Sequence, residues 1–277
     1  MLAAPRAVPG ANRLAGREET RMKTLQLRSV TLGSGRPKVC VPLVGRTLDE
    51  LRRGVQALVI ADLDLVELRI DLLAGAAEQP ALVQEALGLV RGALPSGVPV
   101  LFTYRTTREG GNQPISADGY TALLVGAITS GAIDAVDVEM LTPNEGRQVI
   151  VAAARAASVA VVMSNHEFTV TPPKDEIIRR LVAQQELGAD VTKIAVMPTS
   201  ARDVVTLLDA TEEFVATHAL VPTITMSMGS LGAISRLAGE TFGSSLTFGA
   251  VGATSAPGQL EAGELRGILD ILHRSAR

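Results

Sequence analysis

Short apolar runs rich in β-branched residues alternate with longer amphipathic stretches along most of the chain. The runs are almost continuously apolar, which is typical of strands buried on both faces of a parallel sheet. The stretches between them repeat apolar residues at three- and four-residue spacing, as at Leu48, Leu51, Val55 and Leu58, and this spacing indicates amphipathic helices. The pattern predicts eight strands, at residues 39–44, 65–70, 98–104, 133–140, 158–164, 190–196, 222–228 and 245–251.

This alternation favours an α/β fold of the closed (β/α)8 TIM-barrel type. Eight strand and helix pairs within residues 22–277 match the roughly 250 residues of such a barrel, so we expect this range to form one catalytic domain. The alternative is an open, doubly wound dinucleotide-binding sheet, which would place a G-x-G-x-x-G turn after the first strand. The segment at residues 44–47 lacks that glycine spacing, and no lysine follows a glycine as a phosphate-binding P-loop requires.

The N-terminal segment differs from the rest of the chain. Residues 1–21 contain four arginines and only short apolar stretches, so they lack the continuous apolar region of a secretory signal and predict a disordered extension. The alternating residues Leu25, Leu27, Val30 and Leu32 then predict a short β-hairpin ahead of the barrel.

Composition narrows the class of protein further. A net charge of −3 argues against an electrostatic nucleic-acid binder, and 47% hydrophobic residues can form a large core. No apolar run reaches the roughly 18 to 20 residues of a membrane-spanning helix, so we expect no membrane partner. The single cysteine, Cys40, excludes an internal disulfide and any cysteine-based metal site, which fits a reducing cytoplasm.

Lysine is scarce, with four residues against 22 arginines, and only Lys193 lies within an apolar predicted strand. A buried, unpaired ammonium is costly, and burial favours the neutral amine, which is a nucleophile toward carbonyl carbon. The alternative is a structural role, in which Lys193 forms a buried salt bridge with an acidic residue of a neighbouring strand. Glu67, Asp137 and Glu139 are the candidates for that bridge.

Ionisable residues recur at the carboxyl ends of five consecutive predicted strands, where (β/α)8 barrels place their chemistry. Each one alone is more often a solvated loop residue, and Glu67 with Arg69 could be a simple ion pair at the rim. His166 follows the fifth strand, and beside a nucleophilic lysine it becomes a candidate proton shuttle.

Several stretches resemble one family, type I 3-dehydroquinate dehydratase (3-dehydroquinase), the Schiff-base enzyme of the shikimate pathway and of aromatic amino acid biosynthesis. The resemblance runs from about Met22 to His273, and it implies a barrel with an N-terminal hairpin closing its base. It also implies a homodimer that acts on 3-dehydroquinate and needs no cofactor and no metal. The motifs that carry it are VELRID, FTYRTTREGG, VDVEM, VVMSNHEF, TKIAVMP, TITMSMG, ISRLAGETFGS and LTFGAVGATSAPGQ.

The resemblance also assigns roles to individual residues. Lys193 matches the Schiff-base lysine, His166 the general acid and base, and Glu109 the carboxylate that orients the histidine. One position departs from the pattern: Pro42 stands where many members have a serine that touches the substrate. The positions that match substrate-binding residues are Glu67, Arg69, Arg105, Arg236, Ser255 and Gln259, and those that match pocket-lining residues are Asp137, Glu139, Met226, Met228 and Phe248.

The resemblance implies that a lyase removes water from 3-dehydroquinate by syn elimination to give 3-dehydroshikimate. One rival is a Schiff-base aldolase or transaldolase, which would need a phosphate site after the last two strands. Arg236 and the SAPGQ stretch fit a carboxylate and hydroxyls better than a phosphate. The other rival is a catalytically silent barrel that serves as a binding module, and the presence of both Lys193 and His166 disfavours it.

Overall fold

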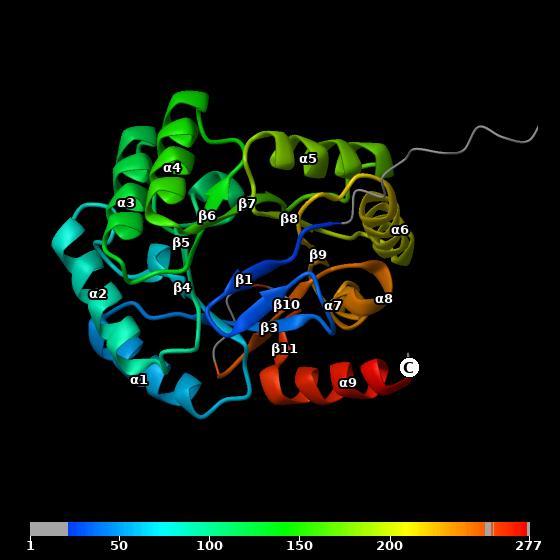
Figure 1. The fold of residues 1–277 in the computed structure, drawn as a ribbon, viewed down its shortest axis with the longest axis horizontal. Coiled ribbons are helices and arrows are strands. Elements are labelled where there is room, and N and C mark those ends of the chain that lie inside the picture. Colours follow the sequence, from blue (N-terminus) through cyan, green and yellow to red (C-terminus); the bar gives the residue numbers. More distant parts are fainter. Residues whose placement is uncertain (1–21, 253–255, 257, 276–277) are drawn as a thin grey trace, which may run out of the picture.

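Eight parallel strands, β3 to β10, follow one another around a closed barrel (Figure 1). The computed structural model describes residues 22–252, 256 and 258–275, so the predicted extension at residues 1–21 lies outside the described residues. The barrel closes where Thr223 bridges Ser244 and the Ser245 amide donates to the Thr223 carbonyl oxygen at 2.8 Å. All eight predicted strands are confirmed, as β3 (Lys38–Leu43), β4 (Leu65–Arg69), β5 (Val100–Thr103), β6 (Ala135–Glu139), β7 (Ala160–Glu167), β8 (Val191–Val196), β9 (Thr223–Ser227) and β10 (Leu246–Ala250).

Helices cover the outside of the barrel and bury the apolar faces that the sequence predicts. In α1, Leu51, Val55 and Leu58 point into the core, and the Thr47 side chain caps the first turn by accepting from the Glu50 amide. The long helices are α1 (Leu48–Val59), α2 (Pro80–Ala93), α3 (Ala117–Thr129), α4 (Asn144–Ala157), α5 (Lys174–Glu186), α6 (Ala201–Thr217) and α9 (Ala262–Ser275).

The apolar pattern did not predict five short elements, because they are two to five residues long. Four of them lie at the carboxyl end of the barrel, and the fifth, Gly239–Phe242, lies near the base, where Gly239 approaches Pro37 just before β3. Elements of this length bury too few residues to show a period of either two or 3.6. They are the 3-10 turns η1 (Ile70–Leu72) and η2 (Thr107–Glu109), the helices α7 (Ala233–Leu237) and α8 (Gly239–Phe242), and the strand β11 (Leu260–Glu261), which extends the sheet beside β10.

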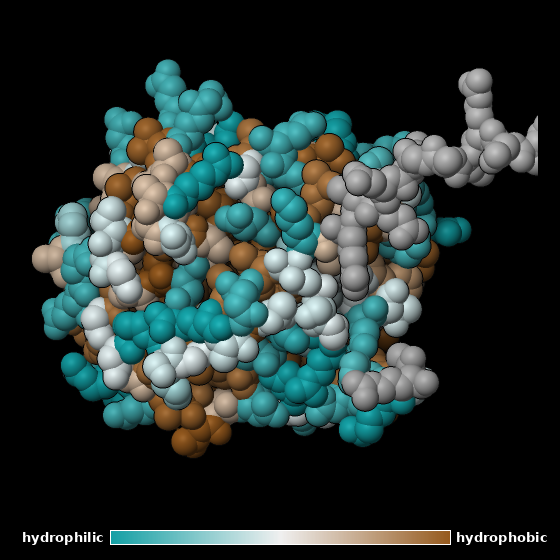
Figure 2. Space-filling model, viewed as in Figure 1, coloured by the Kyte–Doolittle hydropathy of each residue, from teal (hydrophilic) through white to brown (hydrophobic). Residues whose placement is uncertain are grey.

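The predicted hairpin is present and closes the base of the barrel (Figure 1). Strands β1 (Leu25–Leu27) and β2 (Val30–Leu32) are antiparallel, and Arg28 adopts φ 47° in the turn between them. Leu27, Val30 and Leu32 are buried against inward-facing strand residues such as Cys40. The hairpin therefore excludes water from the lower half of the barrel, and Figure 2 shows the mixed hydrophilic and hydrophobic surface of this face.

Three aspartates tie neighbouring strands together at the base, one before every second strand. Asp64 precedes β4, and its amide donates to the Val39 carbonyl oxygen while its carboxylate accepts from the Val39 amide. Asp134 ties β6 to Val100 in β5 in the same way, and Asp190 ties β8 to Val161 in β7. The aspartates thus satisfy backbone groups at the lower rim and fix the stagger between paired strands.

Candidate active site

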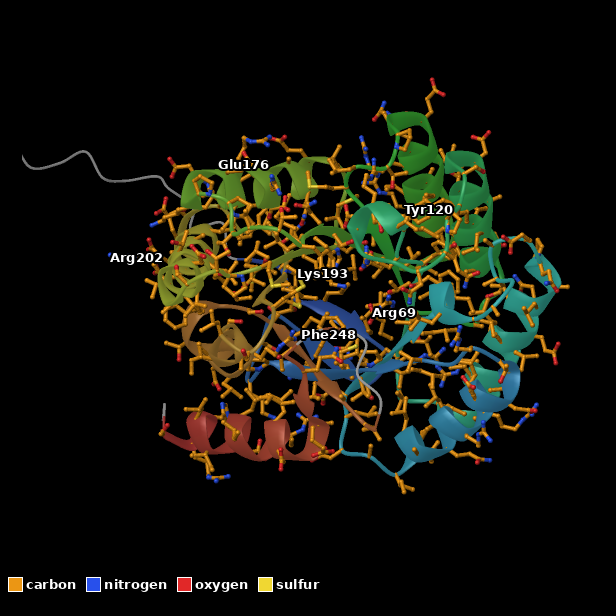
Figure 3. All side chains as sticks on the ribbon, turned by 180° about the vertical axis from the view of Figure 1, so that it is seen from behind. Arg69, Tyr120, Glu176, Lys193, Arg202 and Phe248 are labelled. Carbon is orange, nitrogen blue, oxygen red and sulfur yellow. The ribbon has the colours of Figure 1, made fainter. Side chains whose placement is uncertain are left out.

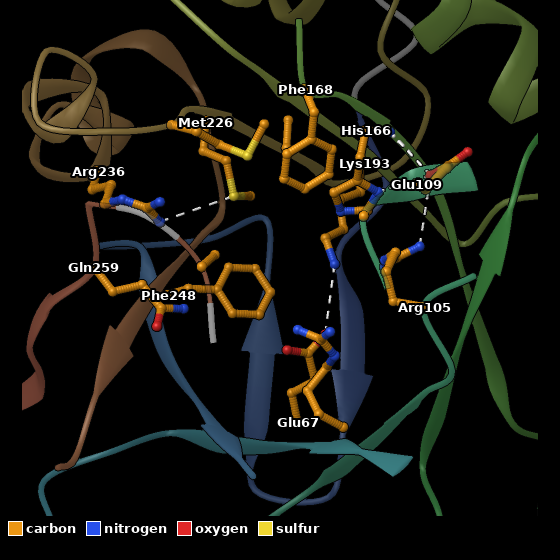
Figure 4. A pocket seen from close by; sticks show the side chains of 15 residues that line it. Glu67, Arg105, Glu109, His166, Phe168, Lys193, Met226, Arg236, Phe248 and Gln259 are labelled. Atoms are coloured by element: carbon orange, nitrogen blue, oxygen red, sulfur yellow. Dashed lines mark hydrogen bonds and ion pairs between the residues drawn. The ribbon is translucent and has the colours of Figure 1, made fainter. Parts of the chain in front are cut away.

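The predicted site residues gather around a cavity at the carboxyl end of the barrel, opposite the hairpin (Figure 3). Inward-facing side chains of five strands and the loops after them form its wall. Figure 4 shows basic, acidic and apolar groups around one central space. The lining residues are Glu67, Arg69, Arg105, Glu109, Gly110, His166, Phe168, Lys193, Ala195, Met226, Met228, Arg236, Phe248, Ala256 and Gln259.

Lys193 projects from the middle of β8 toward the centre of this cavity and is only 3% exposed. Its Nζ atom lies 2.9 Å from Asp137 Oδ2 and 3.7 Å from Glu67 Oε1, and 4.8 Å from the centre of the Phe248 ring. The buried salt bridge considered as an alternative is therefore present. It does not exclude a chemical role, because the same amine lines the cavity and a substrate carbonyl can reach it.

Asp137 and Glu139 do not line the cavity, contrary to our expectation. Both are fully buried in β6, where Asp137 contacts Lys193 and Glu139 contacts Arg105, and neither is among the lining residues. Asp137 accepts from Ser164 Oγ at 2.6 Å and contacts Lys193, while Glu139 accepts from the amide and hydroxyl of Thr106 at 2.8 and 2.6 Å. Their role is to support the residues that do reach the cavity.

Arg105 joins these buried carboxylates into one network. Its Nη2 atom lies 2.9 Å from Asp137, and its Nη1 atom lies 3.0 Å from Glu139 and 3.6 Å from Glu109. Burial alone would raise the pKa of Asp137, but Arg105 and Lys193 together lower it far below its ordinary value. Asp137 is thus a permanent negative charge beneath the lysine.

His166 and Glu109 form a hydrogen-bonded pair beside Lys193 (Figure 4). Glu109 Oε2 accepts from the His166 backbone amide at 3.1 Å and lies 2.9 Å from the ring Nδ1. Glu109 Oε2 accepts from Nδ1–H, which it can do whether the carboxyl group is ionised or carries a proton on Oε1. The proton of the neutral ring is therefore fixed on Nδ1, and Nε2 is left as the base.

The surroundings shift the pKa values of this pair in opposite directions. Burial and the nearby cations Arg105 and Lys193 lower the pKa of His166 well below its ordinary value, against the effect of Asp137. Burial raises the pKa of Glu109 to about 8; Arg105 opposes this rise, while Glu139 and Asp137 add to it. At neutral pH the imidazole is therefore neutral and able to accept a proton.

Asp71 holds the lining residue Arg69, and the sequence did not single it out. Its buried carboxylate accepts from Arg69 Nε and Nη2, both at 2.8 Å, and this fork fixes the guanidinium at the wall of the cavity. The Gln113 side chain in turn donates to the carbonyl oxygens of Asp71 and Leu73 at 2.7 and 2.8 Å. The spacing of Glu67, Arg69 and Asp71 could have identified Asp71 as a partner of Arg69, since residues two apart share one face of a strand.

Arg236 and Gln259 lie across the cavity from Lys193, with the Met226 thioether between the two sides (Figure 4), and Met228 also lines the cavity. Arg236 is 2% exposed, and burial lowers its pKa to about 10, so it remains a cation at neutral pH. Its Nη1 atom lies 4.0 Å from Met226 Sδ. Ser255, predicted to bind substrate in the same loop, lies outside the described residues.

Pro42 is buried in β3, paired in register with Glu67, and it is not among the lining residues. Phe168 is a lining residue that we did not predict, because the residue after a strand end carries no periodic signal. Its ring stacks near His166, with the ring centres 6.4 Å apart, and it covers Gly110 so closely that a Cβ atom there would lie 2.4 Å from it. Phe168 thus shields one side of the imidazole from water.

Two classes of feature are absent from the part of the chain that the structure describes. No group of three or more histidine, cysteine, aspartate or glutamate side chains is placed to hold a metal ion there. No helix among those residues combines the length and the apolar character needed to cross a membrane.

The arrangement combines a primary amine, a neutral imidazole and three buried arginines around one cavity. The amine can attack a carbonyl, the imidazole can move a proton, and the arginines can bind a carboxylate or hydroxyls. These are the components of a Schiff-base reaction on a small, polar, anionic substrate.

Comparisons with known proteins agree with this chemistry. A family model described as type I 3-dehydroquinase matches residues 39–276. The 3-dehydroquinate dehydratase of Clostridium novyi is 49% identical over 252 residues, which is 91% of this chain and 99% of that protein. The enzyme of the same name from Listeria monocytogenes is 47% identical over 253 residues, with coverage of 91% and 99%.

Solved structures give the same result. The crystal structure of a type I 3-dehydroquinate dehydratase from Clostridium difficile, with covalently modified comenic acid, matches with a TM-score of 0.89 and 43% identity, covering 92% of this chain and 99% of that one. The 3-dehydroquinate dehydratase of Geobacillus kaustophilus matches with a TM-score of 0.86 and 36% identity, covering 93% and 99%.

Proposed function

The chain belongs to the type I 3-dehydroquinase family, and from this we propose that it is a hydro-lyase that removes water from 3-dehydroquinate to give 3-dehydroshikimate in the shikimate pathway. We propose that residues 22–277 form its single catalytic domain. The observation that carries the proposal is the buried Lys193 amine, which faces one cavity together with the neutral His166 imidazole and the Arg69 and Arg236 guanidinium groups.

The chemical difficulty is the removal of a proton from C2, next to the C3 ketone, because the carbanion needs an electron sink. Lys193 supplies this sink. After losing its proton, the amine attacks C3, the carbinolamine loses water, and the resulting iminium accepts electrons far better than the ketone does. The Asp137 carboxylate, 2.9 Å from Nζ, would then stabilise the positive charge of the iminium.

His166 would perform the proton transfers. Its Nε2 atom takes the C2 proton to give an enamine, and the imidazolium so formed returns a proton to the C1 hydroxyl as that group leaves as water. One histidine suffices because syn elimination removes both groups from the same side. Glu109 holds the ring by Nδ1 at 2.9 Å and, in its ionised form, would support the cationic ring. Hydrolysis of the imine then releases the product and regenerates the amine.

Substrate binding would rest on the arginines and the neighbouring polar residues. We propose Arg236 as the clamp for the carboxylate, because a guanidinium offers two parallel hydrogen bonds and this one is buried in the wall of the cavity. Glu67, Arg69, Arg105, Ser255 and Gln259 would bind hydroxyls. Met226, Met228 and Phe248 would exclude water from the reacting centre.

Borohydride reduction in the presence of 3-dehydroquinate, followed by peptide mass analysis, tests the central step. We expect one substrate adduct, on Lys193, and none in Lys193→Met, which should also lose turnover. The His166→Ala variant should still form the adduct slowly while elimination almost stops. An adduct on another residue, or turnover without any adduct, would refute the mechanism.

We further infer that the enzyme is a cytoplasmic homodimer. Support for the dimer comes from the family resemblance, and support for the compartment comes from the single, buried and unpaired Cys40 thiol, whose pKa burial raises. Light scattering of the purified protein measures the oligomeric state, and a monomer mass at micromolar concentration would contradict the dimer.

A further inference from the structure

The backbone of Lys193 is held by a side chain from outside the barrel. Gln184 lies in the last turn of α5, and its Oε1 atom accepts from the Lys193 amide at 2.8 Å while its Nε2 atom donates to the Lys193 carbonyl oxygen at 2.9 Å. The Gln184 side chain is fully buried. One primary amide therefore satisfies both polar backbone groups of the residue that carries the reacting amine.

A second residue of the same helix holds the strand that carries the histidine. Arg180 lies one turn before Gln184, and its Nη1 atom donates to Asn165 Oδ1 at 2.9 Å. Asn165 precedes His166 in β7, and because strand residues alternate in direction, its side chain points to the helix while His166 points into the cavity. Residues four apart in a helix share one face, so one face of α5 contacts both catalytic strands.

We propose that Gln184 is a positioning residue for the reaction, which sets the place of the Lys193 amine relative to His166; this inference rests on the proposed function. The strands β7 and β8 are paired directly, with Ser164 opposite Lys193. The Gln184 side chain also fixes the Lys193 backbone to α5, and Arg180 of the same helix contacts β7, the strand that carries His166. The Lys193 side chain is long and flexible, so fixing its backbone narrows the volume that the amine explores.

The chain offers a matched control in the next residue. Gln185 also uses its side-chain amide to hold backbone, since Nε2 donates to the His218 carbonyl oxygen at 3.1 Å and Oε1 accepts from the Leu220 amide at 2.6 Å. These contacts join α5 to the loop before β9, away from the cavity. The two glutamines thus share helix, chemistry and bond type but differ in what they hold.

The first test compares Gln184→Leu with Gln185→Leu. For Gln184→Leu we expect kcat and the rate of the borohydride-trapped adduct to fall about 10- to 100-fold, the loss typical of a misplacement near 1 Å. KM should change less than about threefold, because the substrate-binding arginines lie on other elements. Gln185→Leu should lose thermal stability but keep kcat and the adduct rate.

The second test uses Gln184→Glu, which keeps the shape of the side chain and makes the clamp depend on pH. The protonated carboxyl can still donate to the Lys193 carbonyl oxygen, whereas the ionised form cannot, and burial raises the pKa of such a carboxyl. The charged groups around this clamp are present in both proteins: Arg180 and Glu176 on α5, Glu167 on β7 and Asp137 against the lysine amine. We therefore expect the ratio of variant to wild-type kcat to fall at least fivefold from pH 6 to pH 9.

The outcomes distinguish a failure of the Gln184 positioning role from a failure of the proposed function. An adduct rate within about twofold of wild type in Gln184→Leu would overturn the positioning role, and so would a pH-independent ratio in Gln184→Glu. If Gln184→Leu does not fold, the Gln184→Glu ratio decides. A wild-type enzyme that turns over without an adduct on Lys193 would instead refute the proposed function.

Discussion

Replacing Asp71 by asparagine removes one charge from a buried ion pair with little change in shape. In the wild-type protein Asp71 accepts from Arg69 Nε and Nη2, both at 2.8 Å, and the carboxylate is fully buried. The asparagine oxygen can still accept from Nε, but its NH2 group then faces the Nη2 donor. The guanidinium therefore loses a charge partner and one hydrogen bond, and it is free to turn away from its place in the cavity wall.

This geometry gives the size of two effects, a loss of unfolding free energy and a rise in KM. Removing one partner of a buried ion pair costs about 3–5 kcal/mol of unfolding free energy, and we expect the lower end because Glu67 also acts on Arg69. A loss of about 3 kcal/mol lowers the Tm of a protein of this size by roughly 6–12 °C. A displaced charge-assisted hydrogen bond to substrate is worth about 1.5–3 kcal/mol, which corresponds to a rise in KM of about 10- to 150-fold.

Steady-state kinetics measure the second effect, since dehydration creates a conjugated enone whose ultraviolet absorbance follows turnover. We expect kcat to change less than about threefold, because Lys193 and His166 are untouched. Asp64→Asn is the control, since Asp64 pairs at 2.7 Å with Arg266, which is also buried but lies at the base of the barrel. If Asp71→Asn lost stability as the control does and kept a wild-type KM, Asp71 would have no part in placing Arg69 for substrate.

Three further predictions concern the histidine and its surroundings. Burial and Arg105 lower the pKa of His166 well below its ordinary value. In a pH profile, the acid limb of kcat/KM should therefore have its midpoint well under pH 6.5, and a midpoint at or above pH 6.5 would contradict this. Glu109 has a pKa raised to about 8 in the fold and an ordinary value near 4.3 in the unfolded chain, so the wild type loses stability as pH rises through this window. Urea unfolding should therefore show Glu109→Gln gaining stability relative to wild type between pH 5 and pH 8, and a constant difference would exclude the effect. The Gly110→Ala substitution places a Cβ atom 2.4 Å from the Phe168 ring, at a residue whose φ is +86°. We expect the variant to lose at least about 1 kcal/mol of unfolding free energy and to have a lower kcat/KM. An unchanged Tm and an unchanged rate would show that Phe168 moves freely.

The apolar periodicity was enough to predict the barrel. The strands β3 to β10 are buried along nearly their whole length, so their runs are almost continuously apolar and easy to recognise. The hairpin alternates because only one of its faces is buried. The short elements η2 and α7 supply the lining residues Glu109 and Arg236, yet they could not be predicted, because tertiary contacts rather than local periodicity hold them in place.

Site residues could be predicted where a reactive side chain lies within or directly after an apolar strand. Lys193 and His166 stand out in the sequence as polar residues in or after apolar strands. Asp137 was placed in the lining, whereas it lies beneath it, because the strand pattern gives the inward face but not the depth at which a side chain stops. Gln184 carried no signal, since a glutamine on a helix is ordinarily exposed and its contact with β8 depends on how the helix packs.

The aspartate ties at the base bear on the order in which the barrel is assembled during synthesis. Asp64, Asp134 and Asp190 each join a strand to the one just before it in the chain. The pairs β3–β4, β5–β6 and β7–β8 can therefore each form these hydrogen bonds as soon as the second strand leaves the ribosome. The last pair has Ser245 instead, whose amide reaches Thr223 at 2.8 Å. The nascent chain is thus expected to grow in increments of two strands, and the ring becomes complete only when β10, among the last elements made, meets both β9 and β3.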